Sequence, residues 1–316
     1  MKIRINSNQE DNYKASKDLL AAINTALFLR RPLLISGEPG TGKTECADFV
    51  ARQLKKAYPE KFKSETALRF NTKSVSQSTD LFYQYDAVGH FGDQENGSKE
   101  SFISFNSLGK AVLRTHASNE DWASFQNYRT EVANGNEGFG SVVLIDEIDK
   151  APRDFPNDLL AELEKPPFKF NIKELNHLEF KQNDEMPIIV IITSNSEKGL
   201  PDAFLRRCVF HHISFPKPEV LLEIVKAKLH SNDPGFTKAI ELFERFRSLT
   251  NIGKPPATSE LIDWISCLME EKLLEKELGE LPTASKKYRE KLKDTLGVIA
   301  KNKADFDILN REIERK

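Results

Sequence analysis

The segment that decides the fold is an octapeptide at residues 37 to 44, which reads Gly37-Glu38-Pro39-Gly40-Thr41-Gly42-Lys43-Thr44. It matches the pattern G-x-x-x-x-G-K-[ST] at every defined position. The glycines allow successive backbone N–H groups to turn inward and form a concave site for phosphate oxygens. In this pattern the lysine amine contacts the β- and γ-phosphates, and the final hydroxyl ligates Mg²⁺. The octapeptide therefore predicts that the chain binds ATP and Mg²⁺.

The residues on both sides of the octapeptide provide the context that a phosphate-binding loop needs. Pro32 to Ser36 is a short, mostly apolar run that predicts a buried strand. Lys43 to Tyr58 predicts a helix with Phe49, Val50 and Leu54 on its inner face. The amino terminus of such a helix directs its positive dipole end at the loop and attracts phosphate. A chance match in an unrelated loop would lack this order of strand, loop and helix.

A second predicted strand ends in two acids. Val142 to Ile145 is entirely apolar, and Asp146 and Glu147 follow it directly. Ligands bind outside the carboxyl ends of the strands in open α/β sheets. We expect Asp146 to hold Mg²⁺, directly or through water, and Glu147 to activate the attacking water as general base. The pattern alone is also typical of a solvated strand end, and the octapeptide upstream favours the functional interpretation.

Two further features lie downstream of the acids. Ile188 to Thr193 predicts another central strand, and Asn195 follows it. Asn195 fits either the orientation of water near the γ-phosphate or an ordinary turn. Arg206 and Arg207 lie in the sequence LPDAFLRRC. They fit either a contact with a helix carboxyl terminus or an arginine finger, which stabilises the transition state on a neighbouring subunit's nucleotide.

The pattern of secondary structure predicts two domains. Apolar strands alternate with helices up to residue 217, with a β-hairpin expected from Phe168 to Phe180, and only helical segments follow. Continuous apolar strands between helices predict a parallel sheet that is covered on both faces. We expect an α/β ATPase domain at residues 1 to 217, and a helical lid with C-terminal helices at residues 218 to 316. The polar stretches 92 to 100 and 133 to 140 predict loops.

Composition excludes several classes of protein. The 316 residues are 39% hydrophobic and 30% charged, which fits a globular chain rather than a disordered one. A net charge of -2 gives no reason to propose duplex nucleic acid as the main partner. The three cysteines lie far apart, without the spacing of a disulfide framework or a zinc site. With no visible signal peptide and no membrane-length apolar run, we expect a cytoplasmic protein without a membrane partner.

The motifs together resemble those of AAA+ ATPases. GEPGTGKT, VVLIDEIDKA, TSN and LPDAFLRRC follow one another in that family's order. The sequences RPLLISGEPGTGKT, TKSVSQSTDLFYQYDAVGHF, NDLLAELEKPPFKF and KPPATSELIDW are similar to those of the MoxR branch. The resemblance covers about residues 10 to 270. It implies a P-loop core with a five-stranded parallel sheet, a small helical lid, and a ring, usually a hexamer, with ATP at the subunit interfaces.

The resemblance also assigns roles to single positions. Asn195 matches sensor 1, and Arg207 matches the arginine finger, with Arg206 as the fallback. The hairpin at Phe168 to Phe180 looks like the pre-sensor 1 insertion, which often lines the pore, and the segment from Gly89 to Leu108 looks like the helix 2 insertion. Lids of this family usually carry a sensor 2 arginine at the start of a helix. Glu260 stands at that place here, with Lys254 nearby.

These observations support one main hypothesis and two alternatives. The main hypothesis is a chaperone-like ATP hydrolase that remodels a protein partner, and the resemblance implies a von Willebrand factor A domain protein as that partner. The first alternative is a nucleic-acid motor of a restriction or defence system. The second is an ATP-dependent assembly switch with slow turnover, which the absence of an arginine at the Glu260 position favours.

Overall fold

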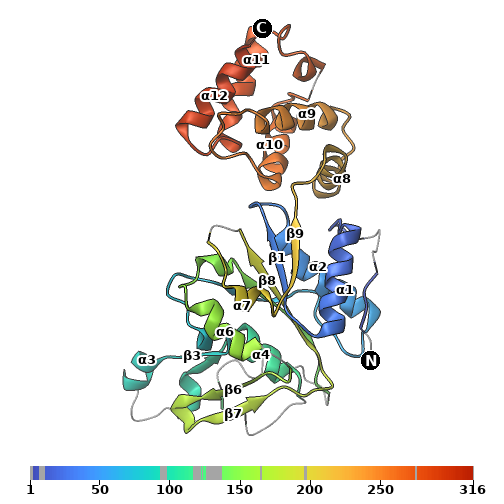
Figure 1. Cartoon of the computed structure of the whole chain (residues 1–316). Helices are drawn as coiled ribbons and strands as arrows, with labels where there is room; N and C mark the ends of the chain where they lie inside the picture. The colour runs from blue at the N-terminus through green and yellow to red at the C-terminus, as the bar shows by residue number, and fades with distance from the viewer. Residues whose placement is uncertain are drawn as a thin grey trace. The chain divides into compact units, whose positions relative to one another are not determined.

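The computed structural model describes residues 3–6, 11–92, 98–116, 122, 124–125, 137–163, 166–195, 198–274 and 276–315 (Figure 1). The chain forms two compact units. Unit 1 consists of residues 1–9, 15–37 and 43–213, and unit 2 of residues 10–14, 38–42 and 214–316. The octapeptide is thus divided, because its middle five residues group with the helical unit and its ends with the α/β unit.

A five-stranded parallel sheet forms the centre of unit 1, which confirms the predicted fold class. Its strands lie in the order β2-β5-β8-β1-β9. The inner strands are almost fully buried, and the two edge strands alternate between partly buried and exposed positions, as expected from helices covering a parallel sheet. The bounds are β1 (Leu33–Gly37), β2 (Leu68–Asn71), β5 (Ser141–Asp146), β8 (Ile188–Ser194) and β9 (Val209–Ile213).

The first helix shows how local sequence sets the ends and the buried face of an element. α1 (Lys17–Leu29) begins after Ser16, whose hydroxyl oxygen accepts a hydrogen bond from the Leu19 backbone N–H at 3.1 Å. The helix ends at Arg30, which has left-handed backbone angles. Its buried residues are the four that helical spacing predicts: Leu19, Ile23, Ala26 and Leu27.

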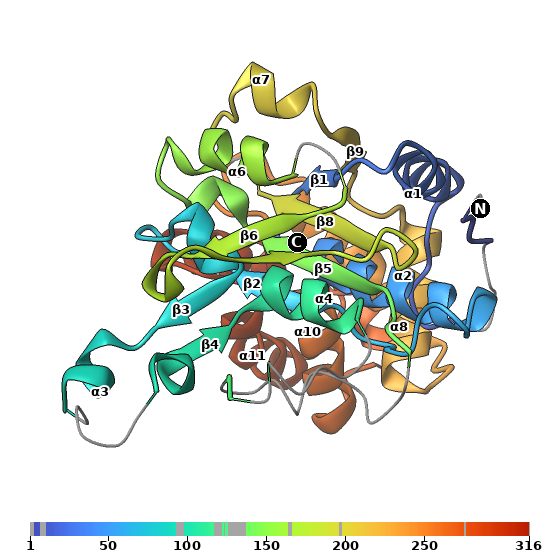
Figure 2. The ribbon, with the colours of Figure 1, turned by 90° about the horizontal axis from the view of Figure 1, so that it is seen from below.

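The remaining helices of unit 1 lie between its strands along the chain. The α-helices are α2 (Lys43–Ala57), α3 (Ala87–Gly92), α4 (Ser107–Arg114), α6 (Phe155–Leu163) and α7 (Asp202–Leu205). Short 3₁₀ turns are η1 (Ser78–Leu81), η2 (Lys99–Phe102), η4 (Ile148–Lys150) and η5 (Lys173–Leu175). Figure 2 shows α3 projecting away from the sheet beyond the end of β3 (Tyr83–Tyr85).

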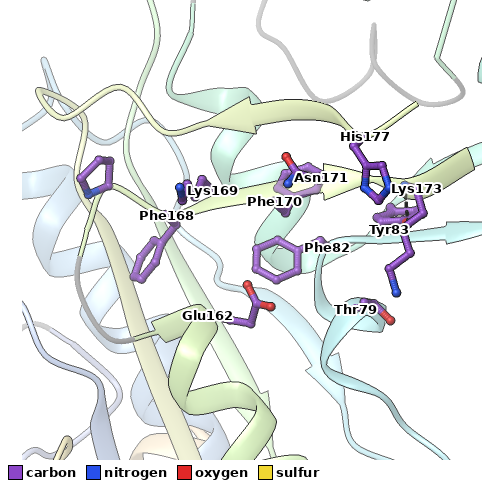
Figure 3. Close-up of a pocket in the computed structure, with 11 residues that line it drawn as sticks. Thr79, Phe82, Tyr83, Glu162, Phe168, Lys169, Phe170, Asn171, Lys173 and His177 are labelled. Carbon is purple, nitrogen blue, oxygen red and sulfur yellow. Dashed lines mark hydrogen bonds between the residues drawn. The ribbon is translucent and has the colours of Figure 1, made fainter. Parts of the chain in front are cut away.

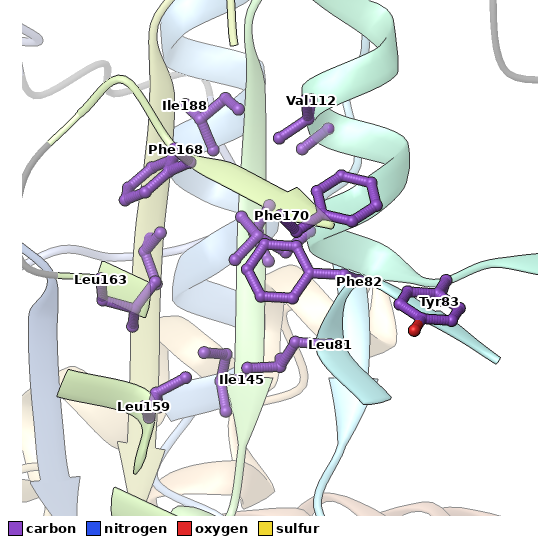
Figure 4. Packing of buried hydrophobic residues seen from close by; sticks show 14 of the residues in the cluster. Leu81, Phe82, Tyr83, Val112, Ile145, Leu159, Leu163, Phe168, Phe170 and Ile188 are labelled. Atoms are coloured by element: carbon purple, nitrogen blue, oxygen red, sulfur yellow. The ribbon is translucent and has the colours of Figure 1, made fainter. Parts of the chain in front are cut away.

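Two antiparallel hairpins extend unit 1 beyond its sheet. β3 pairs with β4 (Ile103–Phe105), and β6 (Lys169–Ile172) pairs with β7 (Leu178–Lys181). The second hairpin confirms the sequence prediction, whereas the three-residue strands of the first were not predicted. Phe82 and Phe170 stack with ring centroids 4.8 Å apart inside the hydrophobic core (Figure 4). The Tyr83 hydroxyl donates to Glu174 at 3.0 Å and accepts from the Lys173 backbone N–H at 3.2 Å, which joins the two hairpins.

Unit 2 is helical throughout its described part, as predicted. Its elements are α8 (Pro218–Leu229), α9 (Gly235–Arg247), α10 (Thr258–Glu270), η6 (Lys276–Gly279), α11 (Lys286–Asp294), η7 (Leu296–Val298) and α12 (Lys303–Glu314). None of the helices within the described ranges is long and apolar enough to cross a membrane.

The last 45 or so residues, which lie outside the family resemblance, belong to the core of unit 2. Leu292, Leu309 and Ile313 are fully buried in one cluster with Trp264 of α10. The Trp264 indole N–H donates to the Thr295 hydroxyl at 2.8 Å. The C-terminal helices therefore complete the hydrophobic core of the helical unit. The polar stretches expected as loops lie partly outside the described residues, which resume at residue 98 within the first stretch and at residue 137 within the second.

Candidate functional site

The candidate site of unit 1 is formed where three adjacent strands end. In the sheet β5, β8 and β1 are neighbours, and all three run in the same direction. Their carboxyl ends therefore meet at one edge, where ligands of open α/β sheets bind. Asp146 ends β5, Asn195 follows β8, and Lys43 and Thr44 begin the helix α2 that follows the loop after β1.

The Thr44 hydroxyl and the Asp146 carboxylate are in contact. Thr44 Oγ1 lies 3.1 Å from Asp146 Oδ1 and 3.2 Å from Oδ2. Thr193 at the end of β8 donates its hydroxyl to the same carboxylate and accepts the Glu147 backbone N–H at 2.9 Å. A hydroxyl and a carboxylate are the oxygen ligands that Mg²⁺ prefers, usually together with water and phosphate. The donor set fits that ion, although the described residues contain no group of three or more acidic, histidine or cysteine ligands.

Glu147 and Asn195, predicted to act together, are joined by a hydrogen bond. The Asn195 side-chain amide donates to Glu147 Oε1 at 3.0 Å. Lys150 forms an ion pair with Oε2 of the same carboxylate. Asn195 is itself held by its backbone N–H, which donates to the buried Asp149 carboxylate at 3.2 Å. Both oxygens of the Glu147 carboxylate therefore have protein partners.

Backbone geometry explains the glycines of the octapeptide. Gly40 and Gly42 have φ angles of 72° and 83°, a left-handed conformation that strains other residues. A Cβ atom at Gly40 would lie 2.7 Å from the Ala257 Cβ atom within unit 2. Lys43 is 6% exposed, and its amine donates to the Gly37 carbonyl oxygen at 2.8 Å. The loop thus has the conformation and the buried amine that phosphate binding requires.

Arg247 contacts the octapeptide within unit 2, a contact that was not predicted from the sequence. Its guanidinium lies 2.8 Å from the Glu38 carboxylate and 3.5 Å from the ring centroid of Phe215. The Thr41 hydroxyl forms a hydrogen bond within the octapeptide, because it donates to the Glu38 carbonyl oxygen at 2.8 Å. An arginine at the end of an amphipathic helix is typical of a helix-dipole contact, so the sequence carried no signal for this contact.

Glu260, at the place where a sensor 2 arginine is expected, has structural partners. Its carboxylate accepts the Ala257 backbone N–H at 2.5 Å, at the start of α10. The other oxygen pairs with Lys301 at 3.3 Å. Lys254 is held through its backbone N–H, which donates to Asp305 at 3.1 Å. These contacts give Glu260 a role in holding the first turn of α10.

Arg206 and Arg207 lie at the end of α7, and both side chains are exposed. Arg207 donates to the Ala203 carbonyl oxygen at 3.5 Å. An arginine finger acts on a neighbouring subunit, so its role stays a prediction.

Two other titratable groups have shifted pKa values without joining the site. Burial raises the pKa of the Cys208 thiol to about 12, although the charge of Arg31 opposes the shift, so this thiol stays protonated near neutral pH. Burial lowers the pKa of His211, which the carboxylate of Asp18 partly offsets. Both groups fit structural roles.

One family model matches the chain over most of the α/β unit. The family described as "ATPase family associated with various cellular activities (AAA)" matches residues 33–217. The solved structure titled "Crystal structure of FIGL-1 AAA domain in complex with ADP" is similar, with 17% identity over 96% of this chain and 89% of that chain and a TM-score of 0.43. No curated protein sequence matches. Because the family match covers more than half of its residues, the chain belongs to the AAA family of ATPases.

Proposed function

We propose that this protein is a Mg²⁺-dependent ATP hydrolase of the MoxR branch, which assembles into a ring and remodels a protein partner. The observation that carries the proposal is the continuous set of contacts from Thr44 through Asp146, Thr193 and Glu147 to Asn195. It brings together, from three strand ends, the residue types that nucleotide hydrolysis requires.

Each residue has a proposed task. The backbone from Gly37 to Gly42 and the Lys43 amine bind the phosphates, and Thr44 and Asp146 hold Mg²⁺. When bound, the ion neutralises charge on the β- and γ-phosphate oxygens. Glu147 accepts the proton of the attacking water, and Asn195 fixes the direction of the Glu147 carboxylate.

The proposed ring completes the site. Arg207 of one subunit, with Arg206 as the fallback, stabilises negative charge at the nucleotide of its neighbour. Support comes from their exposure on α7, where they are accessible to another copy of the chain. A hexameric ring, the assignment to the MoxR branch and a von Willebrand factor A domain protein as partner rest on the sequence resemblance, as does a chaperone-like activity.

The test is steady-state ATP hydrolysis at increasing protein concentration, with Glu147→Gln and Arg207→Ala beside the wild type. We expect the specific rate to rise with concentration, because the site is shared between subunits. Glu147→Gln lowers kcat by about 10²- to 10⁴-fold and retains ATP binding. Arg207→Ala lowers kcat by about 10³-fold. A rate that is independent of both concentration and Arg207 would contradict the shared site.

A second candidate, the slow-turnover assembly switch, is favoured by the contacts of Glu147. Lys150 and Asn195 occupy both carboxylate oxygens, so the proton-accepting atom is engaged before water arrives. Ring formation that requires ATP, together with negligible hydrolysis at every concentration, would favour the switch over the remodelling enzyme. The nucleic-acid motor has no comparable observation in its favour among the described contacts.

A further inference from the structure

Unit 1 contains a cavity of about 630 Å³, which the candidate nucleotide site does not use. It lies beside the hairpin of β6 and β7, and its other walls come from the end of α6 and from the segment that leads into β3 (Figure 3). Its volume is within the range of about 300 to 1,000 Å³ that is typical of ligand sites. Its lining combines aromatic rings with a few charged groups.

One of the residues that line this cavity is an acid, Glu162. The Glu162 carboxylate points into the space between the rings of Phe168 and Phe82 (Figure 3). Among the described residues, no hydrogen bond or ion pair is recorded for this carboxylate. Burial raises its pKa, and no cation among the described residues is recorded as counteracting that shift. A partly buried carboxylate without a counter-ion is stabilised by any cation that enters the cavity.

The aromatic lining suits a cation as well. Phe82, Phe168 and Phe170 line the cavity, and the faces of such rings attract ammonium and guanidinium groups. Two lysines also contribute to the lining but do not neutralise the acid. Lys169 pairs with Glu179 across the hairpin at 3.9 Å. The Lys173 side chain runs from beside His177 toward Thr79, apart from Glu162 in the view of Figure 3. The Glu162 end is therefore suited to a positive group.

The shape of the wall favours a polypeptide over a free amine. Five consecutive residues, 167 to 171, line the cavity. Three of them, Lys169 to Asn171, belong to β6. Alternate residues of a strand point to opposite faces, so this consecutive series indicates that the edge of β6 forms part of the wall. Within the described ranges, β6 has a strand partner on one side only, which is β7. An open strand edge binds extended peptides through main-chain hydrogen bonds.

We propose that this cavity binds a lysine or arginine side chain of an extended polypeptide segment. The cationic group contacts the Glu162 carboxylate, the aliphatic stem packs on Phe82 and Phe168, and the peptide backbone follows the edge of β6. The inference rests on the proposed function, since it gives the remodelled protein partner a chemical class, namely a segment with basic residues.

The test measures peptide binding without nucleotide, by fluorescence anisotropy of a labelled hexapeptide that alternates alanine and lysine. The control peptide has norleucine in place of lysine, which keeps the stem and removes the charge. Glu162→Gln is expected to weaken binding of the lysine peptide by about tenfold or more, as expected for losing a hydrogen bond to a charged group. Asp158→Asn, an exposed acid on the same helix and outside the cavity, leaves binding unchanged.

A second variant with reversed charge, Glu162→Lys, guards against the possibility that Glu162→Gln loses binding only because it misfolds. Glu162→Lys should no longer bind the lysine peptide. It should instead bind a hexapeptide in which glutamate replaces each lysine. Binding of the lysine peptide that survives in both Glu162 variants would overturn the proposal. Displacement of the peptide by equimolar spermidine would overturn the choice of a polypeptide and assign the cavity to a free polyamine.

ATP hydrolysis is measured on the same samples, so that the two proposals can fail separately. Glu162→Gln should keep the wild-type rate, because Glu162 lies outside the nucleotide site. Peptide binding without any hydrolysis would leave the inference standing and contradict the enzyme. Hydrolysis without peptide binding would contradict the inference alone.

Discussion

Thr44 Oγ1 lies 3.1 Å from Asp146 Oδ1, although the two residues are 102 positions apart in the chain. The contact exists because β5 and β1 flank the same central strand, β8, and end at the same edge of the sheet. Thr193, at the end of β8, is bonded to the same carboxylate. The side chains of Thr44, Asp146 and Thr193, from three segments that are distant in sequence, thus hold one another in position at this edge.

Thr193 should be essential for the geometry of the acids. Thr193→Val removes the acceptor of the Glu147 backbone N–H in a fully buried position. We expect a loss of about 1 to 3 kcal/mol in the free energy of unfolding, because a buried polar group loses its partner. Denaturant unfolding measures this loss, and ATP hydrolysis should fall with it. Thr25→Val on the exposed side of α1 is the control and should change stability by about 0.5 kcal/mol at most. Equal effects of the two variants would contradict a structural role for Thr193.

Lys150 should restrain Glu147. The two side chains are partly exposed, at 46% and 38%, so their ion pair contributes about 0.2 to 1 kcal/mol. Lys150→Met releases one carboxylate oxygen, and we expect kcat to rise by about 1.5- to 5-fold. At high salt the kcat of Lys150→Met and of the wild type should be equal, because salt screens the ion pair of the wild type. A fall in kcat would instead show that Lys150 assists hydrolysis.

Leu309 tests whether the C-terminal helices complete the core of unit 2. Leu309→Ala removes a fully buried side chain of α12 and should cost about 2 to 5 kcal/mol of unfolding free energy. Val220→Ala in α8, where the side chain is 37% exposed, should cost about 0.5 kcal/mol or less. The comparison uses thermal unfolding of the full chain. If Leu309→Ala unfolds like the wild type, α12 contributes little to that core.

Asp305 should make the helical unit sensitive to acid. Its carboxylate accepts the backbone N–H groups of Gly253 and Lys254, and these bonds hold the pKa of Asp305 below its ordinary value. A carboxyl group with a lowered native pKa contributes stability above its unfolded pKa of about 3.9, and loses it as the pH falls through the native value.

The measurement compares the wild type with Asp305→Asn by denaturant unfolding at about pH 6 and at successively lower pH below about 4. The stability difference should be full at the higher pH and shrink at the lower values. Asp307→Asn, an exposed acid of the same helix, should show no such change. A difference that is constant with pH would mean that the charge of Asp305 does not contribute.

The sequence predicted those parts of the site that depend on a motif or on the end of a single strand. The octapeptide has a fixed spacing, and the strands before Asp146 and Asn195 are continuous apolar runs, so a place for both residues at strand ends of a parallel sheet was predictable. Thr193 was recognisable only as the end of a strand. Its bond to Asp146 depends on strand order, which one sequence does not specify.

Other features were not predicted, either because an element is too short to show a pattern or because a contact joins segments that are distant in sequence. The strands β3 and β4 have three residues each, too few for a clear alternation of polar and apolar positions. In the sequence, Arg247 is an ordinary arginine at the end of a predicted helix. Only the structure shows that it forms an ion pair with Glu38. Helical spacing predicted α11 and α12 as helices, but their membership of the unit 2 core follows from tertiary packing at Trp264 and Leu309.

The phenolic hydroxyl of Tyr83 has a mechanical consequence. By bonding both Glu174 and the Lys173 backbone, it fastens one projecting hairpin to the other across 90 positions of sequence. A load applied to the β6–β7 turn therefore reaches β3 and α3 without passing through the sheet. The stacked rings of Phe82 and Phe170 join the same two hairpins, so removing the single oxygen atom by Tyr83→Phe would weaken this mechanical connection without breaking it.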